Sequence, residues 1–184
     1  LEMIVKPHTE RDFQKYCGSK EKRLAYWIGY YERLARAMID RGLQAKARPS
    51  WTMRRPSNLE GWFITSDASL LDEDRNVLEP PWGKFTSVGP PILFVDRVLV
   101  PLEAVSGILT NLQWEHEIES FWQAQKAVFP PPLRSTTCGT HVHITPGTPG
   151  SQDKHWSLPQ LRKIAVGIVR YEDLVQAMLP EGRR

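Results

Sequence analysis

Two histidines separated by a single residue are the clearest candidates for chemistry in this 184-residue chain. They belong to residues 138–144, which read CGTHVHI and which we expect to form a β-strand. Successive side chains of a strand point to opposite faces, so His141 and His143 would share one face, roughly 6.5–7 Å apart at the backbone. Gly139 on that face would leave room for a ligand. Imidazoles suit a metal ion or a metal-bound polyphosphate, although two histidines on a solvated face fit the spacing equally well.

Two carboxylates are the next candidates. Glu172 falls on the apolar stripe of a predicted helix, about 20° from Leu161 around the helix axis. Burying a carboxylate is costly unless it is paired or coordinated, and a structural partner such as an arginine meets that need as well as a ligand does. Asp67 follows a predicted strand at Trp62–Thr65, a place where Asp is also common because it favours turns.

The helices and strands that would position these residues are predicted from the spacing of apolar residues and from the capping and breaking residues between them. Apolar residues recur at spacings of three and four in four predicted helices, at residues 24–38, 102–112, 118–128 and 158–179. Gly42 suits a cap behind the first helix, and Pro101 suits the first turn of the second. Ser157 and Gln160 form a capping box that begins the fourth. Strands are predicted at residues 62–65, 84–88 and 138–145.

The composition narrows the class of protein. Apolar residues make up 41% and charged residues 24%, as in ordinary globular domains, so we expect a single domain across residues 1–184. A net charge of +3 without a long basic run argues against nucleic acid as a partner. Two cysteines are too few for a disulfide framework, and no apolar run approaches the ~20 residues that span a bilayer. We therefore expect a cytoplasmic protein without a membrane partner.

Taken in order, these segments resemble the amidoligase family of the carboxylate–amine ligase superfamily, which also contains glutamine synthetase and glutamate–cysteine ligase. The most specific part is the CGTHVHI segment, which is similar to the family's C-G-x-H-V-H-V strand. Four other segments support the resemblance: residues 33–43, 62–70, 89–93 and 158–184. Of these, residues 62–70 are similar to a W…D-x-S-L pattern. Residues 89–93 resemble the end of an E-(I/L)-V-(S/G)-P strand, and Glu172 and Arg183 match positions of the last segment.

The resemblance implies an α+β fold, with an antiparallel sheet backed by helices as in the catalytic domain of glutamine synthetase. It also implies ATP, magnesium, and a small-molecule or peptide carboxylate that is activated as an acyl phosphate and attacked by an amine. His141 would then be a metal ligand, and His143, with Gly139 and Arg183, would bind ATP. Glu172 and Asp67 would be the catalytic carboxylates.

Two departures from the family pattern bear on activity. We find no G-x-E-x-E strand in residues 1–30, and residues 85–88, which precede Gly89, contain no carboxylate. Magnesium prefers oxygen ligands, so the loss of these carboxylates would weaken metal binding. We therefore expect an incomplete domain that lacks the N-terminal acidic strand and the C-terminal part. Two other functions stay open: an inactive homologue that acts as a binding module, and a metal-dependent hydrolase that uses His141 and His143.

Overall fold

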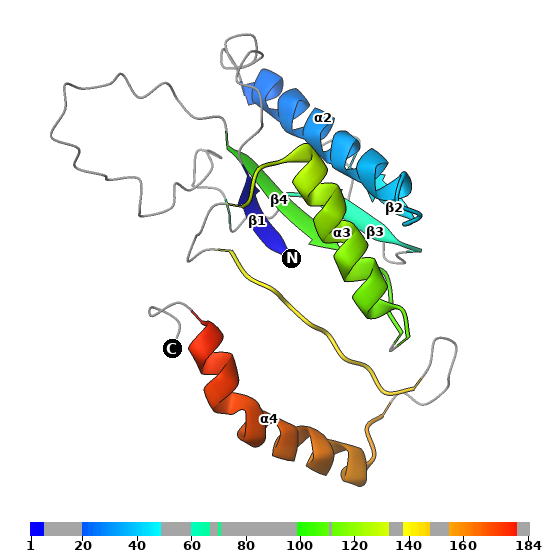
Figure 1. Cartoon of the computed structure of the whole chain (residues 1–184), viewed down its shortest axis with the longest axis vertical. Helices are drawn as coiled ribbons and strands as arrows, with labels where there is room; N and C mark the ends of the chain where they lie inside the picture. Colours follow the sequence, from blue (N-terminus) through cyan, green and yellow to red (C-terminus); the bar gives the residue numbers. More distant parts are fainter. Residues whose placement is uncertain are drawn as a thin grey trace, which may run out of the picture. The chain divides into compact units, whose positions relative to one another are not determined.

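The computed structural model describes residues 1–5, 20–48, 60–66, 70, 99–110, 112–132, 138–147 and 155–179. Its elements follow the order β1 (Glu2–Val5), α2 (Lys20–Ile39), β2 (Ala45–Ala47), β3 (Trp62–Thr65), β4 (Val100–Val105), α3 (Trp114–Val128) and α4 (Leu158–Met178) (Figure 1). The chain divides into two compact units, Leu1–Thr140 and His141–Arg184. The first unit holds the sheet, α2 and α3, and the second holds α4.

The four strands of the first unit form one mixed sheet in the order β1-β4-β3-β2. β1 pairs antiparallel with β4, and β4 pairs antiparallel with β3. β2 runs parallel to β3, which requires a crossover connection between them. The α+β class is therefore confirmed, whereas the expectation of a purely antiparallel sheet is wrong at the β2–β3 pair.

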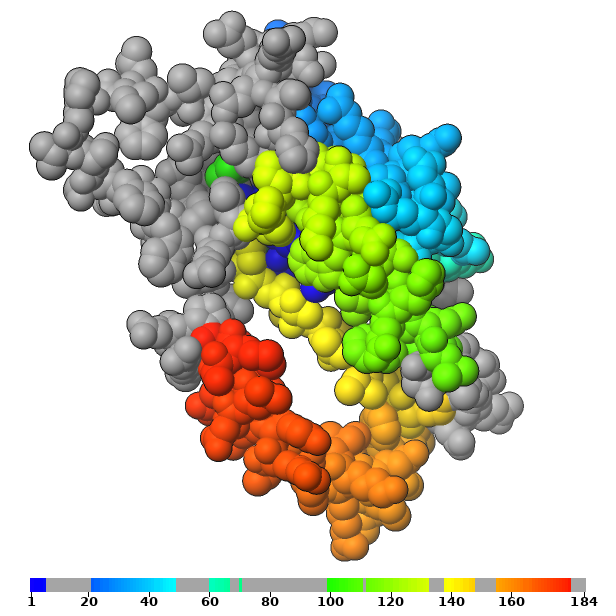
Figure 2. Space-filling view, viewed as in Figure 1, coloured from blue at the N-terminus to red at the C-terminus, as the bar shows by residue number. Residues whose placement is uncertain are grey.

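Helices α2 and α3 pack against each other and against one face of this sheet (Figures 1 and 2). The stripe predicted from periodicity is the buried face of α2, where Tyr31, Leu34 and Met38 are fully enclosed. From α3, Phe121 is also fully enclosed and stacks on Trp62 of β3 with ring centroids 4.9 Å apart. Each such apolar side chain stabilises the fold by roughly 1.5–3 kcal/mol relative to an exposed position.

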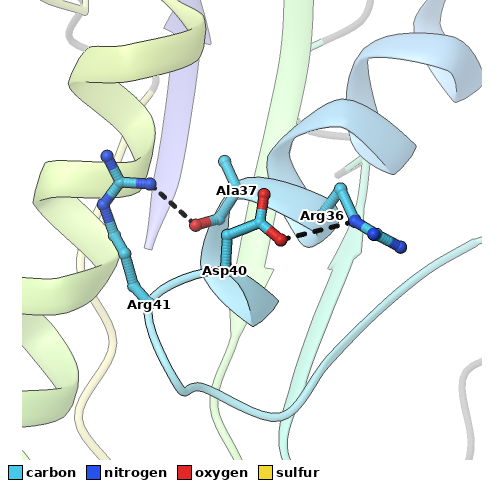
Figure 3. Close-up of polar contacts among 4 residues, drawn as sticks. All are labelled: Arg36, Ala37, Asp40 and Arg41. Atoms are coloured by element: carbon cyan, nitrogen blue, oxygen red, sulfur yellow. Dashed lines mark hydrogen bonds and ion pairs between the residues drawn. The ribbon is translucent and has the colours of Figure 1, made fainter.

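The C-terminal end of α2 matches the prediction for Gly42. This glycine has a φ of 84°, which costs little without a side chain, and its N–H donates to the carbonyl of Ile39. Figure 3 shows the side chains beside this end. Arg41 donates to the carbonyl of Ala37 at 2.8 Å, satisfying an acceptor that the helix leaves without an internal partner, and Arg36 contacts Asp40 at 3.4 Å.

One predicted helix is wrong, because residues 100–105 form the strand β4. The apolar spacing of Leu102, Val105 and Ile108 imitates a helix, but in the structure Val100, Leu102 and Ala104 alternate inward as strand residues do. Strand β1 was not predicted at all, because four residues carry too little periodicity. The predicted strand at residues 84–88 lies outside the described residues.

The other two predicted helices are confirmed. α3 ends at Val128, just before the prolines that begin at Pro130. α4 begins with the predicted capping box: the Ser157 side chain accepts from the Gln160 N–H, and the Gln160 side chain accepts from the Ser157 N–H. No helix among the described residues is both long and apolar enough to cross a bilayer.

Candidate functional site

The sheet face turned away from α2 and α3 carries both polar and apolar residues. Met3, Leu102, Ala104 and Ile64 belong to the core cluster beneath the helices. Because strand side chains alternate, their neighbours lie on the opposite face, which we call the distal face. It comprises Glu2 and Ile4 from β1, Pro101 and Glu103 from β4, and Phe63 and Thr65 from β3.

Two carboxylates stand directly opposite each other on the distal face. Glu2 of β1 pairs with Glu103 of β4 in the antiparallel register. Leu1 and Ala104 next to them exchange both backbone hydrogen bonds, at 3.0 and 2.8 Å, so the Glu2–Glu103 pair is of the closer, non-hydrogen-bonded type with Cα atoms about 4.5 Å apart. Both side chains are half-buried.

Like charges at directly opposed positions destabilise a sheet, and a cation between them relieves that repulsion. Magnesium is usually bound through one or two carboxylates, with water and substrate phosphates completing its shell. Glutamate carboxylates are of the ligand type that magnesium prefers. Among the described residues, no group of three or more His, Cys, Asp or Glu side chains gathers around a common point.

The row that begins with these carboxylates continues across the sheet. Thr65 of β3 lies opposite Glu103, and its side chain is buried. The Arg48 N–H donates to the Ile64 carbonyl at 2.9 Å, which is one of the two backbone bonds of the parallel Ala47–Ile64 pair. We call Glu2, Glu103 and Thr65 the cross-sheet row.

A buried tyrosine fixes the point at which β3 leaves the sheet. The β3–β4 ladder ends at Thr65 and Glu103, and the Tyr31 hydroxyl from α2 then donates to the Pro101 carbonyl at 2.5 Å. Burial raises the pKa of Tyr31, while a hydrogen bond with Ser66 and the charge of Arg48 act in the opposite direction. The Tyr31 hydroxyl therefore links α2 to β4 and to the residue that follows β3.

The segment predicted to be the histidine strand is not a strand in the structure. Its beginning is held to the sheet, because the Glu2 N–H donates to the Gly139 carbonyl at 2.9 Å. Leu1 uses its backbone groups on β4, so the Glu2 N–H faces the other edge of β1, and Gly139 lies along that edge. Cys138 packs beside Ile4 on the distal face. The prediction of a regular strand over residues 138–145 is therefore wrong.

The remaining predicted site residues lie in the second unit or outside the described residues. His141 and His143 are exposed in extended chain. Glu172 is exposed on α4, where it accepts a hydrogen bond from Gln176 at 3.4 Å. Within the second unit, α4 buries none of its side chains. Asp67 and Arg183 lie outside the described residues.

Sequence reasoning missed Glu2 and Glu103. A signal for Glu103 was present: residues 103–107 read EAVSG, which fits the E-(I/L)-V-(S/G) pattern at the Glu, Val and Ser positions better than residues 85–93 do. It was overlooked because residues 102–112 were predicted to be helical. Glu2 has no such signal of its own, because its importance comes from the register with β4.

Comparisons with protein-family models, with curated proteins and with solved structures found no match to this chain.

Proposed function

We propose that this chain is an ATP-dependent carboxylate–amine ligase, forming an amide or peptide bond through an acyl phosphate. The observation that carries the proposal is the Glu2–Glu103 pair, because it supplies two acidic ligands that the sequence analysis had not located. Glu103 stands in the EAVSG stretch of β4, and Gly139 of the CGTHVHI segment is hydrogen-bonded to the neighbouring strand β1. Two segments that resemble parts of the family pattern are therefore bonded to, or belong to, neighbouring strands of the sheet.

The proposed reaction has two transfers. An oxygen of the substrate carboxylate attacks the γ-phosphorus of ATP, and ADP leaves. The nitrogen of the amine substrate then attacks the carbonyl carbon of the acyl phosphate, phosphate leaves, and the amine loses a proton. Bound magnesium neutralises phosphate charge and orients the phosphate for transfer.

Individual residues take the following roles in this proposal. Glu2 and Glu103 hold magnesium in the first unit. The resemblance also implies a metal ligand at His141, which belongs to the second unit. His143, Gly139 and Arg183 contact the nucleotide, while Asp67 and Glu172 act on the substrates. The substrates are a small-molecule or peptide carboxylate and an amine.

A binding module without catalysis is the second candidate. The observation that favours it is α4, which exposes large apolar residues along its length, among them Val166, Ile168 and Val169 at 65%, 65% and 74% exposure. Exposed apolar surfaces of this extent are typical of interaction sites. In that case the carboxylate pair would be a structural remnant.

Calorimetry with Mg-ATP and an assay of ADP release separate the two candidates. We expect the wild-type chain to bind Mg-ATP and to release ADP only when both a carboxylate and an amine are present. Glu103→Gln removes one charge while keeping the side-chain shape, and should weaken magnesium-dependent ATP binding by about tenfold or more. Glu119→Gln is the matched control, because Glu119 is an exposed glutamate on α3.

A second arm tests the histidine segment. The double variant His141→Ala, His143→Ala should lower the affinity for Mg-ATP without changing thermal stability, because both side chains are exposed. Mg-ATP binding that is equal in Glu103→Gln, the double variant and wild type would exclude the ligase. Binding without any ADP release from a panel of acids and amines would favour the binding module.

A further inference from the structure

The apolar residues of α4 have the spacing of a helix that packs against another helix along its length. Their separations alternate between three and four residues, so they stay on one side of the helix. We call this set the α4 seam: Leu161, Ile164, Ile168, Tyr171, Val175 and Met178. All of its members are between 37% and 70% exposed, and α4 buries none of its side chains.

A helix of this composition needs a packing partner. β-branched residues and Gly167 occupy the middle of α4, and both kinds of residue lower the intrinsic preference for a helix. Most helical stability in proteins comes from the packing of an apolar face rather than from propensity. The α4 seam is therefore expected to lie against another surface.

The described residues of the first unit offer no matching surface. Apolar residues on both faces of the sheet are already buried, as shown by Leu102 beneath the helices and by Ile4 and Phe63 on the distal face. The large apolar residues that the described part of this unit exposes lie at the end of α2 or at and before the start of α3: Ile39, Ile108, Leu112 and Trp114. Among the described residues, the surface with the length and spacing of the α4 seam is another α4 seam.

The charges of α4 favour a second copy that runs in the opposite direction. Arg162 and Lys163 lie in the first half of the helix, and Glu172 and Asp173 lie in the second. This order opposes the dipole of the helix itself, which favours acidic groups near the N-terminus and basic groups near the C-terminus. An antiparallel second copy brings the basic half of each helix beside the acidic half of the other, whereas a parallel copy brings like charges together. Arg170 lies near the midpoint and favours neither direction.

We propose that the α4 seam binds the α4 seam of a second copy of this chain, with the two helices antiparallel. The inference does not depend on the ligase proposal. A helix of 21 residues is about 30 Å long and about 10 Å wide, so the pair buries less than about 1,200 Å² in total, an area typical of weak and reversible interfaces. We therefore expect a dissociation constant of about 10–100 µM, and a monomeric chain in dilute solution.

Sedimentation equilibrium of the full chain over a range of concentrations tests the pairing. Ile168→Glu places a carboxylate in the middle of the seam and should raise the dissociation constant at least about 30-fold. Val166→Glu is the matched control, because Val166 and Ile168 are both 65% exposed and lie about 160° apart around the helix. The control should change the dissociation constant by no more than about twofold.

Charge reversal tests the direction. Arg162→Glu combined with Lys163→Glu makes both halves of the helix acidic, so an antiparallel pair should weaken by about 3- to 10-fold at low salt. Adding Glu172→Lys and Asp173→Lys reverses both halves and should restore the affinity to within about threefold of wild type. A parallel pair would show no such recovery, because like halves would still meet.

A wild-type chain that stays monomeric up to about 1 mM would overturn the inference. Equal effects of Ile168→Glu and Val166→Glu would also overturn it. Should Ile168→Glu unfold α4, seen as a loss of helical circular dichroism, the charge variants decide, and no recovery in the fourfold variant would refute the antiparallel pair. A seam variant that lowers the melting temperature equally at every concentration would show instead that α4 packs within its own chain.

Discussion

Helices α2 and α4 have nearly the same length and both are amphipathic, yet one is buried along a face and the other is not. α2 covers 20 residues and places Tyr31, Leu34 and Met38 in the core, whereas α4 covers 21 residues and buries none of its side chains. An apolar stripe predicts that a helix packs against another surface, but it does not identify that surface. The stability of α2 comes largely from packing, and within the second unit α4 is supported by its cap and its own hydrogen bonds.

The largest difference is expected when one apolar residue is truncated in a packed helix and one in α4. Phe121→Ala removes a fully buried ring that stacks on Trp62 and should lower the free energy of unfolding by about 3–5 kcal/mol. Ile168→Ala, at 65% exposure on α4, should lower it by less than about 0.5 kcal/mol. Urea denaturation followed by far-ultraviolet circular dichroism measures both. Similar losses for the two variants would show that α4 is packed as tightly as α3.

Two glycines provide the next test, within the first unit. A Cβ at Gly61 would meet the backbone carbonyl oxygen of Gln44, the acceptor of the Trp62 N–H, and the Gln44 Cβ at 2.7 Å. Gly61→Ala should therefore destabilise by about 1–3 kcal/mol. Gly29 lies within α2 with nothing within 4 Å of a Cβ, so Gly29→Ala should stabilise by up to about 1 kcal/mol. Thermal melting of both variants reports the sign; a stable Gly61→Ala would mean that β2 and β3 are not held this closely.

Tyr31→Phe separates the polar support of the sheet from its apolar packing. It leaves the Pro101 carbonyl without its hydroxyl donor and should cost about 1–3 kcal/mol at neutral pH. Burial raises the pKa of Tyr31 above its ordinary value of 10.0, so the folded state keeps a proton that the unfolded state loses. Wild-type stability due to this group is complete below pH 10 and declines as the pH rises further.

The difference between wild type and Tyr31→Phe should therefore shrink as the pH is raised from 9 to 11. Urea midpoints measured across that range provide the readout. A constant difference would mean that the phenol titrates alike in the folded and unfolded states.

The smallest expected change in stability is for a substitution at the N-terminus of α4. Ser157→Ala removes the hydroxyl that accepts from the Gln160 N–H and should destabilise the helix by about 1 kcal/mol. Amide hydrogen exchange in the first turn of α4 measures this locally, with Ser120→Ala on α3 as a comparison at a position that is not a cap. Exchange that is unchanged by Ser157→Ala would assign the stability of α4 to packing instead.

Local patterns predicted the helices well and the sheet poorly. The stripe of α2, the positive φ at Gly42 and the Ser157/Gln160 box depend on residues within one or two turns of each other, so the sequence displays them directly. β4 was misread because its inward residue Ala104 is a weak apolar signal, while Ile108 beyond the strand completes a false helical spacing.

The candidate site was harder to predict than the fold for a related reason. Gly139 was singled out from its motif, and the structure holds it at the edge of β1. Glu2 and Glu103 become a pair only through the β1–β4 register. The residues near Glu2 and Glu103 in the sequence give no signal that these two glutamates pair.

The pairing of β1 with β4 also has a kinetic consequence. Leu1 and Ala104 are bonded across 103 positions of sequence, so the entropy of closing a long loop must be overcome before this edge of the sheet forms. Contacts this distant slow folding, and we expect the β1–β4 edge to assemble after α2, β2 and β3. A cation held by Glu2 and Glu103 would then bind only the finished sheet. Cation binding would then follow the last folding step. A higher cation concentration would lower the fraction of molecules in which the β1–β4 edge is open.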